Sequence, residues 1–307
     1  MAWTVDIAFN QAYTTVLDTL YQSDPMEIRS AVRVETGVIG KSKNFERLSG
    51  VNMVPVTSRH QATPHTPMTH SRRRATLVDY AANEYIDDLD KVKMLISPQS
   101  EYTQNFVSAW NRRIGKSVTA AALGNAVSVD EAETTANVAL PSSQVIANGG
   151  TNMTFAKVRQ ARRILGNAGV PSTDLWACVS WFAIEKLLSD SIVTSSDFSS
   201  LNALAAGTFP PGTKWMGFQW IVVPDADPDD TSLTPDSTWV LPKTGNIRKC
   251  LFWHKSALGL AIGKDFSAEV SPRADLMNST QVLVKTSLGG TRILDFGVVE
   301  VDIDESA

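Results

Sequence analysis

Two Gly-Lys-Ser tripeptides, Gly40–Ser42 and Gly115–Ser117, are the residues most suggestive of phosphate chemistry in this chain. A phosphate-binding loop also needs a glycine five residues before the Gly-Lys pair, where its backbone N–H groups surround the phosphate. Glu35 and Trp110 occupy those positions. Neither tripeptide therefore predicts a nucleotide site.

The acidic segment 225–230 resembles the start of a calcium-binding loop. Such a loop needs glycine at its sixth position and glutamate at its twelfth, and this chain has Asp230 and Asp236 there. We therefore interpret the segment as a solvated acidic loop and predict no bound metal.

Histidine offers two further candidates for chemistry. His60, His65 and His70 are spaced by five residues in a polar segment, wider than zinc-binding spacings, and no cysteine lies nearby. His254 is a candidate base, and a hydrolase site around His254 and Asp265 remains an alternative from another class. No serine elbow accompanies it, so the sequence favours a protein that is not an enzyme and has no cofactor.

Composition narrows the class further. The formal net charge of −4 disfavours sequence-specific recognition of nucleic acid. No apolar run approaches the roughly 20 residues that span a bilayer, so we expect no membrane. Cys178 and Cys250 are not in metal or redox spacing and are predicted to be buried thiols.

Charge is unevenly distributed along the chain. Residues 31–76 carry six more cations than anions, and residues 295–307 carry five acidic residues and no cation. Segments of opposite charge can attract each other between copies of a chain. The candidate inter-subunit contacts are Lys41, Lys43, Arg47, Arg72, Arg73 and Arg74.

Residues 31–76 also have an unusual pattern. Glycines separate short apolar runs that predict strands and turns, at Val32, Val34, Val38, Ile39, Val51, Val54 and Val56. Residues 57–74 contain almost no large apolar side chain. So long a segment is unusual within a domain, and we expect it to act outside its own domain.

One long helix is predicted over residues 98–124, where Pro98 suits the first turn and Gly124 the end. Its apolar stripe consists of Tyr102, Phe106, Trp110, Ile114, Val118, Ala121 and Ala122. A helix of ~40 Å with one apolar stripe should lie along a sheet.

The remaining patterns predict an α+β protein. Helical segments are expected at 12–21, 87–95, 154–166, 181–188 and 197–204. Strands are expected at 76–86, 218–223, 238–241, 251–254, 282–286, 293–296 and 298–303, with a turn at Leu288–Gly290.

This order of elements resembles the Johnson (HK-ninety-seven-like) capsid fold of tailed phages, podovirus-type major capsid proteins in particular. The segments that carry the resemblance are 74–90, 111–116, 140–146, 254–264 and 289–293. The resemblance implies an N-terminal arm (1–30), an extended loop (31–76), a peripheral domain (77–135 and 265–307) with its spine helix (98–124), and an axial domain (136–264).

The resemblance further implies a major capsid protein that assembles through hexamers and pentamers into an icosahedral shell around double-stranded DNA. The expected partners are other copies of the chain, a separate scaffolding protein, a portal, decoration proteins and DNA bound without sequence recognition. The expected location is the virion, after assembly in the host cytoplasm. An encapsulin-like shell protein is the alternative with the same fold.

Overall fold

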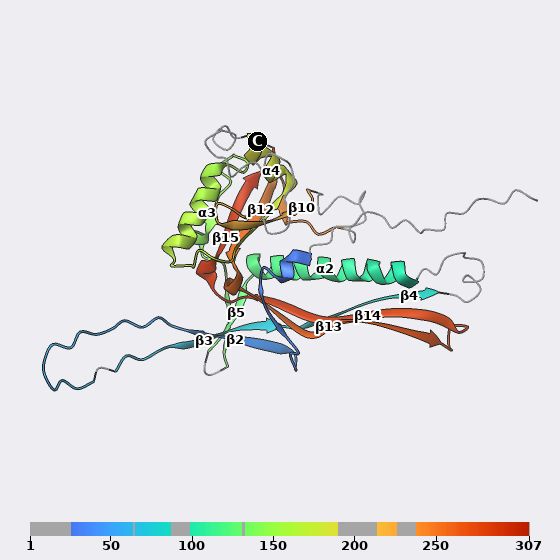
Figure 1. Ribbon diagram of the computed structural model, residues 1–307, viewed down its shortest axis with the longest axis horizontal. Coiled ribbons are helices and arrows are strands. Elements are labelled where there is room, and N and C mark those ends of the chain that lie inside the picture. Colours follow the sequence, from blue (N-terminus) through green and yellow to red (C-terminus); the bar gives the residue numbers. More distant parts are fainter. Residues whose placement is uncertain are drawn as a thin grey trace, which may run out of the picture.

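The computed structural model describes residues 26–63, 65–86, 99–130, 133–189, 214–225 and 238–306. Within them, three sheets and three α-helices form an elongated molecule with two arms that point in opposite directions (Figure 1). The helical segments expected at 12–21, 87–95 and 197–204 lie outside the described residues. None of the described helices is long and apolar enough to cross a membrane.

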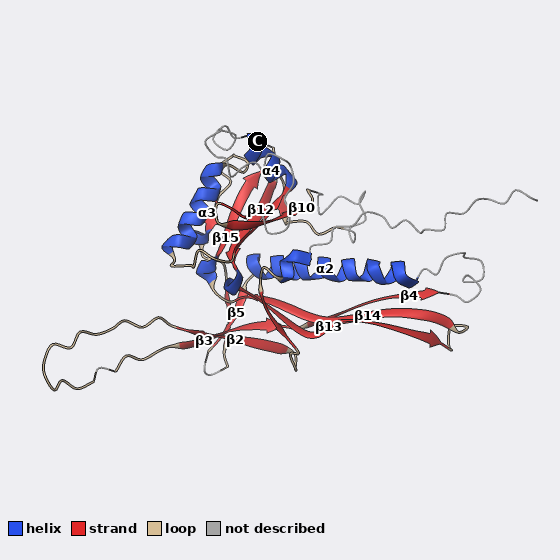
Figure 2. Ribbon diagram, viewed as in Figure 1, coloured by secondary structure: helices blue, strands red, loops and turns tan. Residues whose placement is uncertain are grey.

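The first arm is a four-stranded sheet covered on one face by a long helix (Figure 2). The sheet contains, in spatial order, β1 (Arg33–Thr36), β13 (Leu258–Arg273), β14 (Ser279–Arg292) and β4 (Val78–Ile86). Helix α2 (Gln99–Leu123) lies along β13 and β14. Ile114, Val118 and Ala122 are buried, so the prediction of one helix along a sheet is confirmed.

The turn predicted at Leu288–Gly290 is wrong, because β14 continues through both glycines. A Cβ on Gly289 would lie 2.1 Å from the Thr76 carbonyl oxygen, and one on Gly290 would lie 2.9 Å from the Ala121 Cβ. The glycines therefore allow a neighbouring strand and helix α2 to approach the sheet closely. Residues 293–296 accordingly form no returning strand, and Asp295–Gly297 is a 3₁₀ turn.

The body of the molecule is a seven-stranded sheet. It consists of β7 (Val145–Ile146), β15 (Val298–Asp304), β12 (Ile247–His254), β8 (Leu175–Ser180), β10 (Phe218–Val223), β9 (Lys214–Trp215) and β11 (Lys243–Thr244). Helices α3 (Phe155–Asn167) and α4 (Trp181–Ser189) complete it. Thr154 caps α3 as predicted, accepting the Lys157 N–H. The strands predicted at 218–223, 251–254 and 298–303 are confirmed.

The helix predicted at 181–188 is confirmed as α4, and Trp181 lies on its exposed side with 47% exposure. One other prediction in the body is wrong. Residues 238–241 form no strand, yet Trp239 is buried in an irregular segment. Its ring packs over α2 at Gly115, where a Cβ would lie 2.6 Å from it. Burial, and not strand pairing, therefore explains why this segment is apolar.

The second arm is the extended hairpin, residues 42–76, formed by β2 (Ser42–Leu48), a loop and β3 (His70–Thr76). Its base belongs to a third sheet in the order β2, β3, β5 (Ala126–Val129) and β6 (Thr135–Val138). Figure 1 shows the hairpin projecting away from the β13–β14 tip. The strand expected at Val51–Val56 is absent from it, and these residues lie in the loop.

Two predicted domain boundaries cross these sheets. The border at residue 264 falls inside β13, and β15 pairs with β12 in the seven-stranded sheet. Near the N-terminal side, Ile28, Ala31 and Val32 are buried in the main core, and β1 pairs with β13 in parallel. The division into domains itself stays a prediction.

Candidate assembly interface

The loop of the extended hairpin exposes an unusual set of apolar side chains. Ser49 and Thr69 close its base, with the Ser49 N–H 3.0 Å from the Thr69 carbonyl oxygen. Beyond them, Met53 is 100% exposed. The other exposed large apolar side chains on or beside the hairpin are Ile39, Leu48, Val51, Val54, Val56 and Met68. Apolar side chains gathered on a projecting element typically mark a contact with another protein.

The base of the hairpin, in contrast, is anchored by an aromatic ring. Phe45 is 1% exposed and packs with Ala75, Ala261 and Ile293. A Cβ on Gly259 of β13 would lie 2.8 Å from the Phe45 ring. The glycine therefore provides the space into which the ring inserts, and this small cluster joins the hairpin to the four-stranded sheet.

Of the six predicted contact residues, three carry ion pairs on the surface of the hairpin. Lys43 Nζ lies 2.9 Å from Glu35, Arg72 Nε lies 2.9 Å from Glu46, and Arg74 Nη2 lies 3.2 Å from Glu133. The hydrogen bond from Lys43 is the main cause that lowers the pKa of Glu35. Lys41 is exposed at the start of the hairpin.

The other two, Arg47 and Arg73, meet at Asp295 together with Arg292. Arg73 Nη2 lies 2.5 Å from Asp295 Oδ2, Arg292 Nε 2.7 Å from Oδ1, and Arg47 Nη1 3.9 Å from Oδ2. Burial lowers the pKa of Arg73, and the neighbouring Arg47 and Arg292 lower it further, while Asp295 opposes them. We name Arg47, Arg73, Arg292 and Asp295 the Asp295 cluster.

Arg292 links the Asp295 cluster to two other elements, α2 and β6. It is fully buried and donates to the carbonyl oxygens of Ala122, Gly124 and Val138 at 2.8–3.0 Å. The first two lie at the C-terminal end of α2, where a cation is favoured by the helix dipole. The cluster thus joins the hairpin, α2, β6 and the end of β14 at one point.

Sequence reasoning missed Arg292 and Asp295 as functional residues. It placed the attraction between the basic segment and the acidic C-terminal segment between copies, but Arg73 and Asp295 pair within one chain. Further acidic residues of that segment also have intrachain partners, Glu300 with Lys249 and Glu305 with Arg248. Charge alone indicated that the two segments attract each other, but it could not identify which residues pair or show that they pair within one chain.

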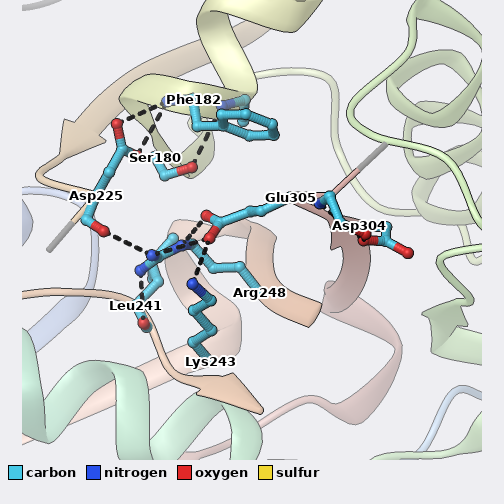
Figure 3. A network of polar contacts seen from close by, with 10 residues as sticks. Ser180, Phe182, Asp225, Leu241, Lys243, Arg248, Asp304 and Glu305 are labelled. Atoms are coloured by element: carbon cyan, nitrogen blue, oxygen red, sulfur yellow. Dashed lines mark hydrogen bonds and ion pairs between the residues drawn. The ribbon is translucent and has the colours of Figure 1, made fainter. Parts of the chain in front are cut away.

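A second polar network holds the end of the body (Figure 3). Arg248 is fully buried and pairs with Glu305, whose carboxylate also lies 3.0 Å from Lys243 Nζ. Arg248 donates to the carbonyl oxygens of Asp225 and Leu241 at 2.8 and 3.2 Å. The network therefore ties the C-terminal strand to both sides of segment 226–237.

Asp225 has a structural role in this network. Its carboxylate accepts the Phe182 N–H at 2.9 Å, at the start of α4 (Figure 3). A carboxylate at this position satisfies a free N–H and is favoured by the helix dipole. The rest of the acidic segment, residues 226–230, lies outside the described residues.

The candidates for enzymatic chemistry have different partners. His254 Nδ1 lies 2.7 Å from Ser256 Oγ and also accepts the Ser256 N–H, so it caps a 3₁₀ turn. Burial lowers its pKa, although Asp174 opposes the shift. Asp265 instead pairs with Arg29 at 2.8 Å. In the part of the chain that the structure describes, no three metal-ligating side chains gather into a group.

A cavity of about 500 Å³ lies beside His254. Arg29, Arg33, Asp174 and Lys255 contribute to its lining. Asp265 does not line it, so the geometry does not assemble the hydrolase site considered as an alternative.

Comparison with known proteins identifies the class. The family model for phage capsid proteins matches residues 5–305. The chain therefore belongs to the phage capsid protein family, and its function is that of a capsid shell subunit in the virion. A search of curated proteins finds no match. The family match does not favour the encapsulin-like alternative.

Solved capsids share the fold. The capsid protein of cyanophage P-SCSP1u is 16% identical with a TM-score of 0.68, over 96% of this chain and 92% of that one. The capsid of Ralstonia phage GP4 is 9% identical with a TM-score of 0.69, over 98% of this chain and 96% of that one. The capsid of Helicobacter pylori bacteriophage KHP30 is 12% identical with a TM-score of 0.68, over 98% of both chains. The predicted Johnson fold is confirmed.

Proposed function

We propose that the chain is a major capsid protein whose extended hairpin docks on a neighbouring copy to close hexamers and pentamers. The observation that carries this proposal is the combination of a buried base at Phe45 with an exposed apolar loop at Met53. Burying those side chains against another copy would be favourable at roughly 25 cal/mol per Å².

The shape of the molecule supports contacts between unlike surfaces. The extended hairpin and the β13–β14 tip lie at opposite ends (Figure 1). A contact that joins one end to a different surface of the next copy is heterologous, and such contacts generate rings when the rotation closes. Rings of six and five copies would then build an icosahedral shell.

The proposed domain division follows the sheets. The seven-stranded sheet with α3 and α4 would form the axial domain, and the four-stranded sheet with α2 as the spine helix would form the peripheral domain. Residues 1–30 would form the arm and residues 31–76 the extended loop, of which β1 also pairs with the peripheral sheet.

The proposed partners extend beyond the shell itself. A separate scaffolding protein would guide assembly in the host cytoplasm, and portal and decoration proteins would join the shell. Double-stranded DNA would be enclosed without sequence recognition, in keeping with the net charge of −4. We propose no enzymatic role.

Electron microscopy of the recombinant protein, alone and with a candidate scaffolding protein, tests the proposal. Shells, tubes or six-membered rings are expected, and a uniform monomer under both conditions would contradict it. Exchanging Lys41, Lys43 and Arg47 for glutamate should abolish assembly. Lys41→Glu alone is the cleaner variant, because Arg47 also donates to the Ile293 carbonyl oxygen and supports the hairpin base. Circular dichroism should show that both variants remain folded.

A further inference from the structure

Strand β3 of the extended hairpin pairs with β5, and two side-chain contacts of different character join the hairpin to the four-stranded sheet and to the segment that follows β14. Phe45 provides an apolar contact, and the Asp295 cluster provides an ionic one. Apolar contact is non-directional, so a single ring can pack at several angles. Charged hydrogen bonds are directional and are roughly twice as strong as neutral ones. The ionic contact is thus the one suited to fixing an angle.

The Asp295 cluster spans the joint about which the hairpin would turn. Arg47 belongs to β2 and Arg73 to β3, whereas Arg292 is the last residue of β14 and Asp295 lies in the 3₁₀ turn that follows it. Arg47 also donates to the Ile293 carbonyl oxygen at 2.9 Å. Both strands of the hairpin are therefore held at one short segment that follows β14.

The cluster is also short of negative charge. Three guanidinium groups face one carboxylate, and the Arg73 side chain is only 3% exposed. Arg73 Nε and Nη1 are buried and have no hydrogen-bond partner among the residues that the structure describes. Without Asp295, the three guanidinium groups would repel each other across the joint. The buried Arg73 would also lose its only carboxylate in the cluster, and an uncompensated buried charge is strongly unfavourable.

We propose that Asp295 is a positioning residue, which holds the extended hairpin at the angle needed for assembly through Arg73 and Arg47. This inference rests on the proposed function only for its consequence, the docking of the hairpin on another copy. The angle itself is a property of the single chain and can be measured without assembly.

The test uses spin labels at Leu48→Cys, at the end of β2, and Ala120→Cys, on the exposed side of α2. Cys178 and Cys250 are buried and should not react with the label. Pulsed electron resonance should give one narrow distribution of label distances in the otherwise native chain. Asp295→Asn and Arg73→Gln should broaden it, and Arg47→Gln should broaden it less.

Two controls separate positioning from general stability. Glu133, between β5 and β6, forms exposed ion pairs with Arg72 and Arg74 of the hairpin, and Glu133→Gln should leave the distribution narrow. Arg73→Lys retains the cation and should restore most of the native distribution. If Asp295→Asn does not fold, Arg73→Gln carries the test, because it leaves the pair between Arg292 and Asp295 in place.

Narrow distributions in both Asp295→Asn and Arg73→Gln would overturn the inference. Broadened distributions together with a loss of shells, measured by electron microscopy on unlabelled variants, would support both the inference and the docking role. Broadened distributions with normal shells would leave Asp295 as the positioning residue and would overturn the docking of the hairpin instead.

Discussion

The seven-stranded sheet and the extended hairpin differ most clearly in where their large side chains lie. Phe252, Trp253 and Trp239 in the body are at most 1% exposed, whereas Met53 in the hairpin loop is fully exposed. The hairpin is joined to the rest of the molecule at its base, by the pairing of β3 with β5, by Phe45 and by the Asp295 cluster. The comparison indicates that stability resides in the body, whereas the hairpin exposes apolar side chains that the proposed docking on another copy would bury.

The largest effect is expected in the core of the body. The centroid of the Phe252 ring lies 5.0 Å from that of Phe218 and 5.9 Å from that of Trp220, with edge-to-face geometry in both pairs. Phe252→Ala should lower the free energy of unfolding by about 3–5 kcal/mol, because it leaves a cavity. Denaturant titration measures the loss. Met53→Ala should cause no measurable change, and similar losses in both variants would refute the comparison.

Breaking the network around Arg248 should have the next largest effect. Glu305→Ala leaves a fully buried guanidinium without its carboxylate, and the expected loss is about 3 kcal/mol. The matched control is Glu133→Ala on the hairpin side, where the glutamate is 67% exposed and the expected loss is at most about 0.5 kcal/mol. Thermal unfolding measures the loss of stability in both variants. A loss in Glu133→Ala as large as that in Glu305→Ala would contradict the prediction.

A smaller effect is expected at Gly289, where the four-stranded sheet meets the end of the extended hairpin. Gly289→Ala places a methyl group against the Thr76 carbonyl oxygen, at the end of β3, and should cost about 1–3 kcal/mol. Hydrogen exchange should rise at Leu77, whose N–H donates to the Lys41 carbonyl oxygen. Gly50→Ala is the control, because its Cβ would meet nothing within 4 Å. Unchanged exchange in the Gly289 variant would show that the extended hairpin and the four-stranded sheet are uncoupled at this contact.

Gly289 also shows where sequence reasoning ends. Helix α2, helix α3 and strand β10 were predictable because their apolar positions repeat with the period of the element itself. Glycine has no such signature, since it suits a turn as well as a close approach. The atom that Gly289 makes room for belongs to Thr76, far away in the sequence, and only the fold brings the two together.

The Asp295 cluster was hidden for the same reason. The excess of cations in residues 31–76 was visible, but Arg73 and Asp295 are 222 positions apart. Nothing local distinguishes the buried Arg73 from its neighbour Arg72, which lies on the surface. Charge composition therefore predicted the attraction, and strand register decided which arginine turns inward.

The smallest effect on stability, and the largest on assembly, is expected in the hairpin loop. The double variant Met53→Ser, Val56→Ser removes two apolar side chains that are 100% and 71% exposed, so the free energy of unfolding should not change. Shell yield in electron microscopy should fall sharply, because these side chains would otherwise be buried in the docking contact. Thr66→Ser alters the same loop without removing a large apolar group and should assemble normally. Normal shells from the double variant would mean that the exposed loop is not the docking surface, and the division between a stable body and an assembling hairpin would then have to rest on the ionic residues at the hairpin base.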